Sequence, residues 1–354
     1  MKNNICAVPE KYKKAVSTEQ RGTISDVTYS VKHYINQSRQ LVVSQNNTFQ
    51  EIGRETVTGN EIRKKCIVYL PADYNKKDKS KKYNVLYLLH GVGGNRNEWL
   101  TGNKNHDDEN IICNIFDNLI ANKEVDPFIV VFTEGRSTYD WTDESFNMMG
   151  TNILGFYYFD YEMRYDLIPF IESEYNTYAN VNDRSEEGIA YNRLHRAIAG
   201  LSMGGMQCLN LGVGGYRCDS VVYTKGVSAW KNGLETTVTA PGMIDLFAYV
   251  GAFSNAPSSS DGKRLGSSIK ACNHKLSLLY MTCGDADEIA YQMGYRNAVG
   301  GLAEAAGDNL GEYYRVVIEG GVHDMQVWNN GAYNFSRLCF KDCSEKLLTC
   351  DIWI

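Results

Sequence analysis

Short apolar runs alternate with helix-like stretches along most of this chain, from Cys66 onward. The runs cover residues 66–70, 83–90, 128–133, 196–200, 247–253, 276–283 and 313–318. Strands this apolar are typical of a sheet that is buried on both faces, and such sheets are mostly parallel with helices between the strands. The pattern therefore predicts an α/β protein with a mostly parallel central sheet and helices on both faces.

Helical periodicity fills the intervals between these runs. Apolar residues recur at helical spacing over 111–120, and further helices are predicted over 203–211 and 290–306. An apolar face over 167–171 is interrupted by Pro169, which lacks a backbone N–H and should kink or restart that helix.

The first sixty residues differ from the rest of the chain because they are polar and rich in Asn, Gln, Ser and Thr. Alternating pieces at 27–35 and 41–43 suggest edge strands or an N-terminal extension. Residues 61–354 then form the predicted catalytic domain, with an insert at about 215–241.

Composition narrows the possible partners and compartments. A net charge of −6 gives no general attraction to nucleic acid, and no apolar stretch is long enough to span a membrane. Residues 1–10 lack the apolar core of a secretion signal, so the protein is expected to be either secreted with its signal removed or cytoplasmic.

Ten cysteines in 354 residues do not make a disulfide scaffold. Those in apolar runs, Cys66, Cys113, Cys208 and Cys283, are expected to be buried free thiols. A disulfide remains open for the C-terminal group Cys339, Cys343 and Cys350.

A Gly-x-Ser-x-Gly segment around Ser202 is the main candidate for chemistry. The bare pattern arises easily by chance in a glycine-rich chain, but here it lies between a predicted strand and a predicted helix. That setting is where a tight turn exposes a nucleophilic serine. A serine hydroxyl also needs a base, an acid that orients the base, and donors for the oxyanion.

Chain order proposes the base and the acid, because α/β-hydrolases place them after the serine, acid first. Of the two histidines beyond Ser202, His323 follows a predicted strand directly and is the better base. The acid should end the 276–283 strand, where Asp285, Asp287 and Glu288 compete. Placement after a two-residue spacer favours Asp287, whereas the other two are alternatives that suit a capping role for the next helix.

Oxyanion donors are expected at two backbone positions. Met203 follows the nucleophile, and Val92 or Gly93 lies in the glycine-rich turn after the 83–90 strand. We also expect Gly93, Gln207 and Trp230 to contact the substrate.

With these residues placed, the chain resembles the esterase family that includes feruloyl esterases, acetyl xylan esterases, esterase D and mycolyltransferases, and above all the family-one carbohydrate esterases. The matching segments are 89–91, 165–172, 200–207, 247–254, Cys283-Gly284 with Asp287, and His323-Asp324 with Val327-Trp328. The resemblance implies an α/β-hydrolase fold, a triad of Ser202, Asp287 and His323, oxyanion donors at Met203 and Val92, and no metal or other cofactor.

The expected activity is hydrolysis of a small-molecule or polysaccharide-linked ester, with release of ferulate or acetate from plant cell-wall polysaccharide such as arabinoxylan. Rival interpretations are a siderophore trilactone esterase, a sugar acyltransferase and an inactive carbohydrate-binding relative. The insert at 215–241 departs from the family pattern, and we hypothesise that it is a two-stranded lid over the substrate.

Overall fold

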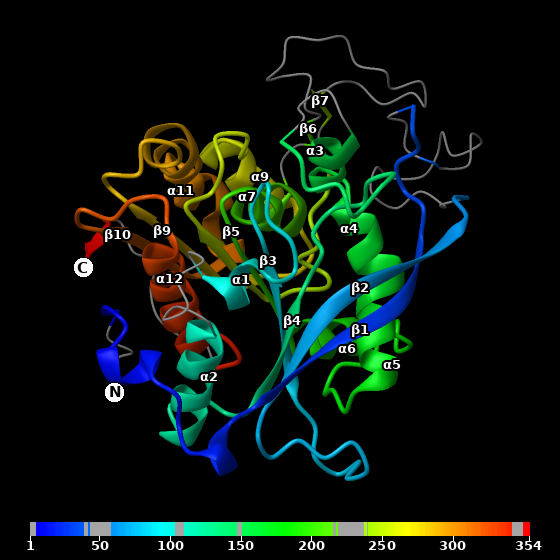
Figure 1. Ribbon diagram of the computed structural model, residues 1–354. Coiled ribbons are helices and arrows are strands. Elements are labelled where there is room, and N and C mark those ends of the chain that lie inside the picture. The colour runs from blue at the N-terminus through cyan, green and yellow to red at the C-terminus, as the bar shows by residue number, and fades with distance from the viewer. Residues whose placement is uncertain are drawn as a thin grey trace.

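One sheet forms the centre of the computed structural model, which describes residues 5–38, 42, 58–102, 110–146, 151–214, 217–218, 237–238, 240–341 and 350–354. Its strands are β1 (Thr23–Lys32), β2 (Glu61–Leu70), β3 (Asn84–Leu89), β4 (Phe128–Phe132), β5 (Arg196–Leu201), β8 (Tyr249–Phe253), β9 (Leu276–Gly284), β10 (Leu310–Ile318) and β11 (Ile352–Trp353). Their order across the sheet is β1-β2-β4-β3-β5-β8-β9-β10-β11 (Figure 1). β1 and β2 pair antiparallel, as do β2 and β4, and every pair from β4 to β11 is parallel. The predicted α/β fold with a mostly parallel sheet is confirmed.

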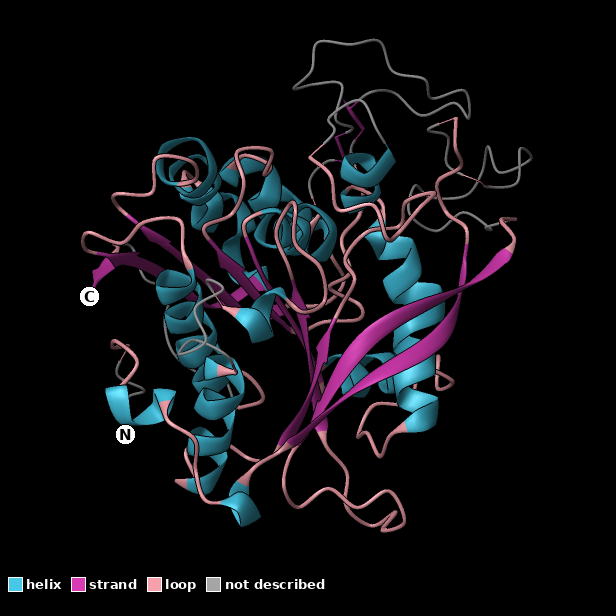
Figure 2. Cartoon of the chain, viewed as in Figure 1, coloured by secondary structure: helices cyan, strands magenta, loops and turns pink. Residues whose placement is uncertain are grey.

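Helices precede, connect and follow these strands (Figure 2). The α-helices are α1 (Glu98–Thr101), α2 (Ile111–Ala121), α3 (Thr151–Phe156), α4 (Phe159–Glu162), α5 (Ile168–Glu174), α6 (Glu186–Arg193), α7 (Met203–Gln207), α9 (Gly262–Ala271), α10 (Asn297–Val299), α11 (Leu302–Ala306) and α12 (Met325–Leu338). Short 3₁₀-helices are η1 (Glu10–Lys13), η2 (Thr18–Gln20) and η7 (Gly307–Asn309), and π-helical turns are η4 (Met163–Leu167), η5 (Cys208–Val213) and η6 (Tyr291–Arg296). Among the helices that the structure describes, none has the length and hydrophobicity that a bilayer crossing requires.

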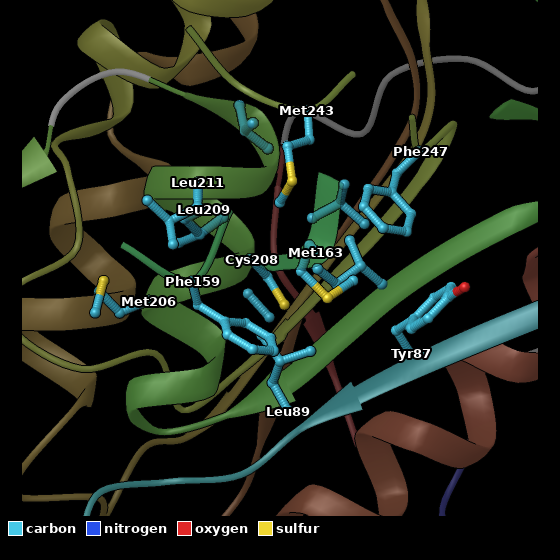
Figure 3. Packing of buried hydrophobic residues seen from close by; sticks show 14 of the residues in the cluster. Tyr87, Leu89, Phe159, Met163, Met206, Cys208, Leu209, Leu211, Met243 and Phe247 are labelled. Carbon is cyan, nitrogen blue, oxygen red and sulfur yellow. The ribbon is translucent and has the colours of Figure 1, made fainter. Parts of the chain in front are cut away.

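The central strands divide their side chains between two separate cores, because successive residues of a strand point to opposite faces. In β3, Val85, Tyr87 and Leu89 join one core, whereas Leu86 and Leu88 join the other. The first core includes residues of α5, α7, α9 and α11, and the second includes residues of α1, α2 and α12. Figure 3 shows the first core, where Phe159, Met163 and Cys208 pack with Leu89.

One predicted helix is broken in the structure, and another contains the predicted proline. The single helix expected over 290–306 is wrong, because it breaks into η6, α10 and α11. The break lies at Gly300-Gly301, where Gly301 has a φ of 71°, a left-handed conformation that ends a right-handed helix. Pro169 lies in the first turn of α5, directly after the π-turn η4, so the helix restarts there as expected.

The N-terminal sixty residues contribute an edge strand and, before it, a segment that packs on two helices of the sheet's second core. β1 forms the edge of the sheet beside β2. Before it, the segment from Cys6 to Lys14 is tied to α2 and α12, since Asn118 Nδ2 donates to the Lys14 carbonyl and Asn334 Nδ2 donates to the Cys6 carbonyl, both at 2.9 Å. Both bonds end on backbone carbonyls of the segment, so asparagine side chains of α2 and α12 fix its path.

The cysteines in the apolar runs are buried free thiols, as predicted. Cys339 is buried, Cys350 is exposed, and Cys343 lies outside the described residues, so a disulfide within this C-terminal group stays a prediction.

A partly buried carboxyl group, that of Asp166, joins the N-terminal region to the π-turn η4. Asp166 accepts hydrogen bonds from the Tyr34 hydroxyl and from the Lys32 N–H, the latter at 3.1 Å. Burial raises the pKa of Asp166 to about 6, although both hydrogen bonds oppose the rise. Folded Asp166 therefore holds a proton that the unfolded chain releases at lower pH.

We predict that this group makes stability fall as pH rises. Between about pH 4 and pH 7, the unfolding free energy of the wild type should drop by about 2 kcal/mol relative to Asp166→Asn, which cannot ionise. Denaturant unfolding at both pH values measures the difference. Asp126→Asn, at an exposed position, should track the wild type, and a constant gap between wild type and Asp166→Asn would contradict the prediction.

Candidate active site

Ser202 lies at a sharp turn between β5 and α7. Its φ of 51° and ψ of −114° are unfavourable for a residue with a side chain, so the surrounding structure must hold them. The Ser202 N–H donates to Phe253 O at 2.9 Å, and the Ser202 carbonyl accepts from Ala256 N at 3.0 Å. Gly200 leaves the turn its space, because a Cβ there would lie 2.5 Å from the carbonyl carbon of Gly204.

The structure brings Ser202, His323 and Asp287 into one hydrogen-bonded line. His323 Nε2 lies 3.0 Å from Ser202 Oγ, and His323 Nδ1 lies 2.7 Å from Asp287 Oδ2. With Nδ1–H donating to the carboxylate, Nε2 is free to accept the serine proton, which is the geometry of a nucleophile, base and acid. Trp328 packs edge-to-face on the imidazole, with ring centroids 5.0 Å apart.

Asp287 is the carboxylate that reaches His323. It is buried, which raises its pKa, but hydrogen bonds from His323 and from the Ala290 N–H outweigh burial and leave the pKa below its ordinary value. The two alternatives lie elsewhere, since Asp285 accepts from Gly320 N–H at 2.7 Å and Glu288 is exposed. Asp287 therefore stays ionised while it orients the imidazole.

The turn after β3 places Val92 beside the nucleophile. Val92 and Met203 both line the cavity at Ser202, and neither N–H donates to a backbone carbonyl of the described residues. Two free N–H groups on either side of a serine are what an oxyanion hole requires. Gly93, the alternative to Val92, is exposed at a φ of 75° and does not line the cavity.

His90 precedes this turn and is wholly buried. Burial lowers its pKa to about 3, with the Arg136 charge contributing, so the imidazole is neutral. Its Nδ1 lies 2.7 Å from the Gly91 carbonyl. His90 therefore supports the turn, whereas His323 is the histidine found within hydrogen-bond distance of Ser202.

A cavity of about 540 Å³ opens beside Ser202 and His323. Most of the lining residues are apolar, and they include Phe146, Ile153, Tyr157, Ile289, Met293 and Trp328. Three of these apolar side chains, Phe146, Ile289 and Met293, are exposed by more than half of their surface. Exposed apolar side chains gathered at a cavity mark a binding surface for an apolar ligand.

The residues expected to contact substrate have mixed positions. Gln207 is buried and does not line the cavity, because its Nε2 donates to the carbonyls of Gly135 and Phe156 at 2.7 and 2.9 Å. Trp230 lies outside the described residues. Of the insert, the structure describes β6 (Arg217–Cys218), which pairs antiparallel with β7 (Thr237–Val238), while residues 219–236 lie outside the described residues.

Sequence reasoning missed several groups at the cavity. Glu98 is the carboxyl group among its lining residues, and Met293 and Ile289 come from the segment after Asp287. Glu98 follows the glycine-rich turn by four residues, and this short distance along the chain was the sequence signal for a place at the cavity. In the described parts of the chain, no group of three or more His, Cys, Asp or Glu side chains is arranged to hold a metal ion.

Residues 59–217 match a family described as putative esterase. In sequence, the chain is 38% identical over 155 residues to endo-1,4-beta-xylanase Y of Acetivibrio thermocellus, covering 44% of this chain and 12% of that enzyme. It is 36% identical over 142 residues to an endo-1,4-beta-xylanase/feruloyl esterase of Xylanibacter ruminicola, covering 40% of this chain and 16% of that enzyme. The chain thus matches less than a fifth of the length of these relatives.

These matches support the resemblance of this chain to the family-one carbohydrate esterases. The chain also shares its fold with a solved feruloyl esterase module from Clostridium thermocellum complexed with sinapinate, at 24% identity and a TM-score of 0.58 over 97% of this chain and 95% of that one. A ferulic acid esterase from Anaeromyces mucronatus in complex with ferulic acid gives a TM-score of 0.61 at 19% identity, over 94% and 96% of the two chains. These likenesses confirm the α/β-hydrolase fold.

The choice of Asp287 as the acid of the esterase is directly testable. Asp287→Asn should lower kcat for an activated ester by about 10³- to 10⁴-fold, because the imidazole then loses the carboxylate that holds its tautomer. Glu288→Gln, one residue away and exposed, should stay within about 3-fold of the wild type. Equal kcat losses in both variants, measured with p-nitrophenyl acetate, would contradict the assignment.

Proposed function

We propose that this protein is a serine esterase that releases ferulate from plant cell-wall polysaccharide such as arabinoxylan through an acyl-enzyme. The observation that carries the proposal is the hydrogen-bonded line of Ser202, His323 and Asp287 beside an apolar cavity. Such a cavity suits the ring of a phenolic acid, whereas acetate offers a single methyl group to bury.

The reaction follows from the positions of these groups. His323 Nε2 takes the Ser202 proton as Oγ attacks the ester carbonyl, and the N–H groups of Met203 and Val92 bind the resulting oxyanion. The tetrahedral intermediate collapses to the acyl-enzyme, and the imidazolium gives its proton to the leaving sugar alkoxide. Water, deprotonated by His323, then attacks the acyl carbon, and ferulate leaves as Ser202 regains its proton.

The printed names of the relatives agree with this substrate class, since one is a xylanase/feruloyl esterase and two similar structures contain sinapinate or ferulic acid. A ferric siderophore fits less well, because such a ligand is anionic and the described lining residues include a carboxyl group, Glu98, and no lysine or arginine. We also propose action outside the cell, where a polysaccharide too large to enter a cell is found.

Ser202→Ala tests the nucleophile. It should retain the wild-type melting temperature and lose at least about 10³-fold in kcat for methyl ferulate, because no other group can form the acyl-enzyme. A fluorophosphonate should label the wild type and leave the variant unlabelled.

A substrate panel tests the acyl group. We expect wild-type kcat/KM to be higher for methyl ferulate than for acetylated xylan or a trilactone siderophore. A preference for acetylated xylan would replace ferulate by acetate, and product analysis with a free sugar as acceptor would reveal an acyltransferase. No turnover and no labelling would favour an inactive carbohydrate-binding relative.

The apolar mouth of the cavity provides a second test. Ile289→Ala with Met293→Ala should lower kcat/KM for methyl ferulate by about 10-fold, because about 50 Å² of apolar contact with the aromatic acyl group is lost. Turnover of p-nitrophenyl acetate should change by less than about 2-fold, since acetate does not extend that far. Leu194→Ala, an exposed leucine outside the cavity lining, is the matched control, and equal losses for both esters would count against an aromatic acyl site.

A further inference from the structure

The carboxyl group of Glu98 lies beneath the glycine-rich turn that carries Val92. Its Oε2 accepts a hydrogen bond from the Gly91 N–H at 2.7 Å, and the same side chain lines the cavity with Ser202 and His323. The turn itself is closed by weaker contacts, such as Gly94 N–H to the Gly91 carbonyl at 3.3 Å. The Glu98 contact is therefore the short side-chain bond that fixes the residue directly before Val92.

The turn is shaped around this carboxyl group. A Cβ on Gly94 would lie 2.3 Å from Glu98 Oε2, so the position has room for glycine alone while Glu98 keeps its place. Next to Glu98, the indole Nε1 of buried Trp99 donates to the Leu89 carbonyl at 3.1 Å. Two consecutive side chains thus anchor the backbone on both sides of His90, at the end of β3.

Val92 needs such an anchor because it lies between two glycines, and Gly93 has open space around its α-carbon. An oxyanion donor contributes fully only when its position is fixed before the reaction, since reorientation during the reaction adds to the barrier. The hydrogen bond with Glu98 holds the peptide group between His90 and Gly91. The next peptide group, between Gly91 and Val92, carries the Val92 N–H.

We propose that Glu98 is a positioning residue for the oxyanion hole, acting through its hydrogen bond to Gly91 N–H. The proposal rests on the proposed esterase function, because it assigns the Val92 N–H to the oxyanion. Glu98 acts on the transition state through this amide, and it forms no bond to the substrate in the proposed reaction.

The Glu98 carboxyl group has a charge as well as a hydrogen bond to the Gly91 N–H. Burial raises the pKa of Glu98, and the Gly91 N–H, His323 and Arg136 oppose the rise. The Glu98 side chain thus combines a charge with a hydrogen-bond acceptor, and these two contributions are separate. Glutamine removes that charge and keeps an oxygen acceptor for the Gly91 N–H, so it separates the hydrogen bond from the charge.

The test compares Glu98→Gln, Glu98→Ala and Glu98→Leu with p-nitrophenyl acetate, which reports on the oxyanion hole whichever acyl group is natural. We expect Glu98→Gln to keep kcat within about 3-fold of wild type, because its amide oxygen still accepts from the Gly91 N–H. Without an acceptor, Glu98→Ala and Glu98→Leu should lose about 10- to 100-fold in kcat with KM changed by less than about 3-fold. Glu174→Ala, at an exposed glutamate on α5, is the matched control.

Binding of phenylboronic acid, which forms a tetrahedral adduct on the serine, should weaken about 10-fold or more in the alanine and leucine variants and little in the glutamine variant. Calorimetry measures this even if no ester is turned over, so failure of the proposed function and failure of this inference are distinguishable. Thermal unfolding identifies a misfolded alanine variant, in which case the leucine variant decides. Equal losses in all three variants, a loss confined to KM, or unchanged boronate affinity would overturn the proposal.

Discussion

The left-handed backbone of Ser202 is the constraint on which the rest of the site depends. β5 lies between β3 and β8 in the parallel part of the sheet, and its turn into α7 is tied to the end of β8 through Phe253 O. Because parallel strands end at the same edge, the turn after β3, Asp287 after β9 and His323 after β10 gather there, with His323 against Ser202 and Asp287 against His323. A nucleophile turn in the middle of the sheet thus gathers groups separated by more than two hundred residues.

A network of buried charged side chains stabilises the segment after β4, next to this edge of the sheet. Lys64 of β2 donates to Glu162 at 2.8 Å and to the Arg136 carbonyl at 2.6 Å, and Arg136 pairs with Glu134 at 2.8 Å. These groups hold the segment after β4, whose Gly135 carbonyl also accepts from Gln207. Gly135 packs against His90, so the network connects the antiparallel edge of the sheet to the oxyanion turn. Removing one partner of such a buried pair costs about 3 to 5 kcal/mol.

The cavity combines this fixed polar site with adaptable apolar walls. Ser202, His323 and Glu98 lie on elements anchored by hydrogen bonds, whereas Ile289 and Met293 follow the acid on a segment that includes the π-turn η6. Chemistry and specificity are therefore carried by different parts of the chain. Substitutions in the walls can alter the preferred ester without moving the triad, which is a common division in enzymes whose loops surround a rigid scaffold.

The sequence by itself determined the strands, the parallel fold, the nucleophile turn and the order of acid and base, because apolar runs and chain order carry that information locally. It favoured Asp287 over Asp285 and Glu288 only by spacing and resemblance, placed Gln207 at the substrate and did not identify Glu98. The tertiary structure decided these, since the choice depends on which side chain reaches His323, which amide is already bonded, and which carboxyl lies under a glycine turn. Such distances arise from packing between distant segments, and no local pattern encodes them.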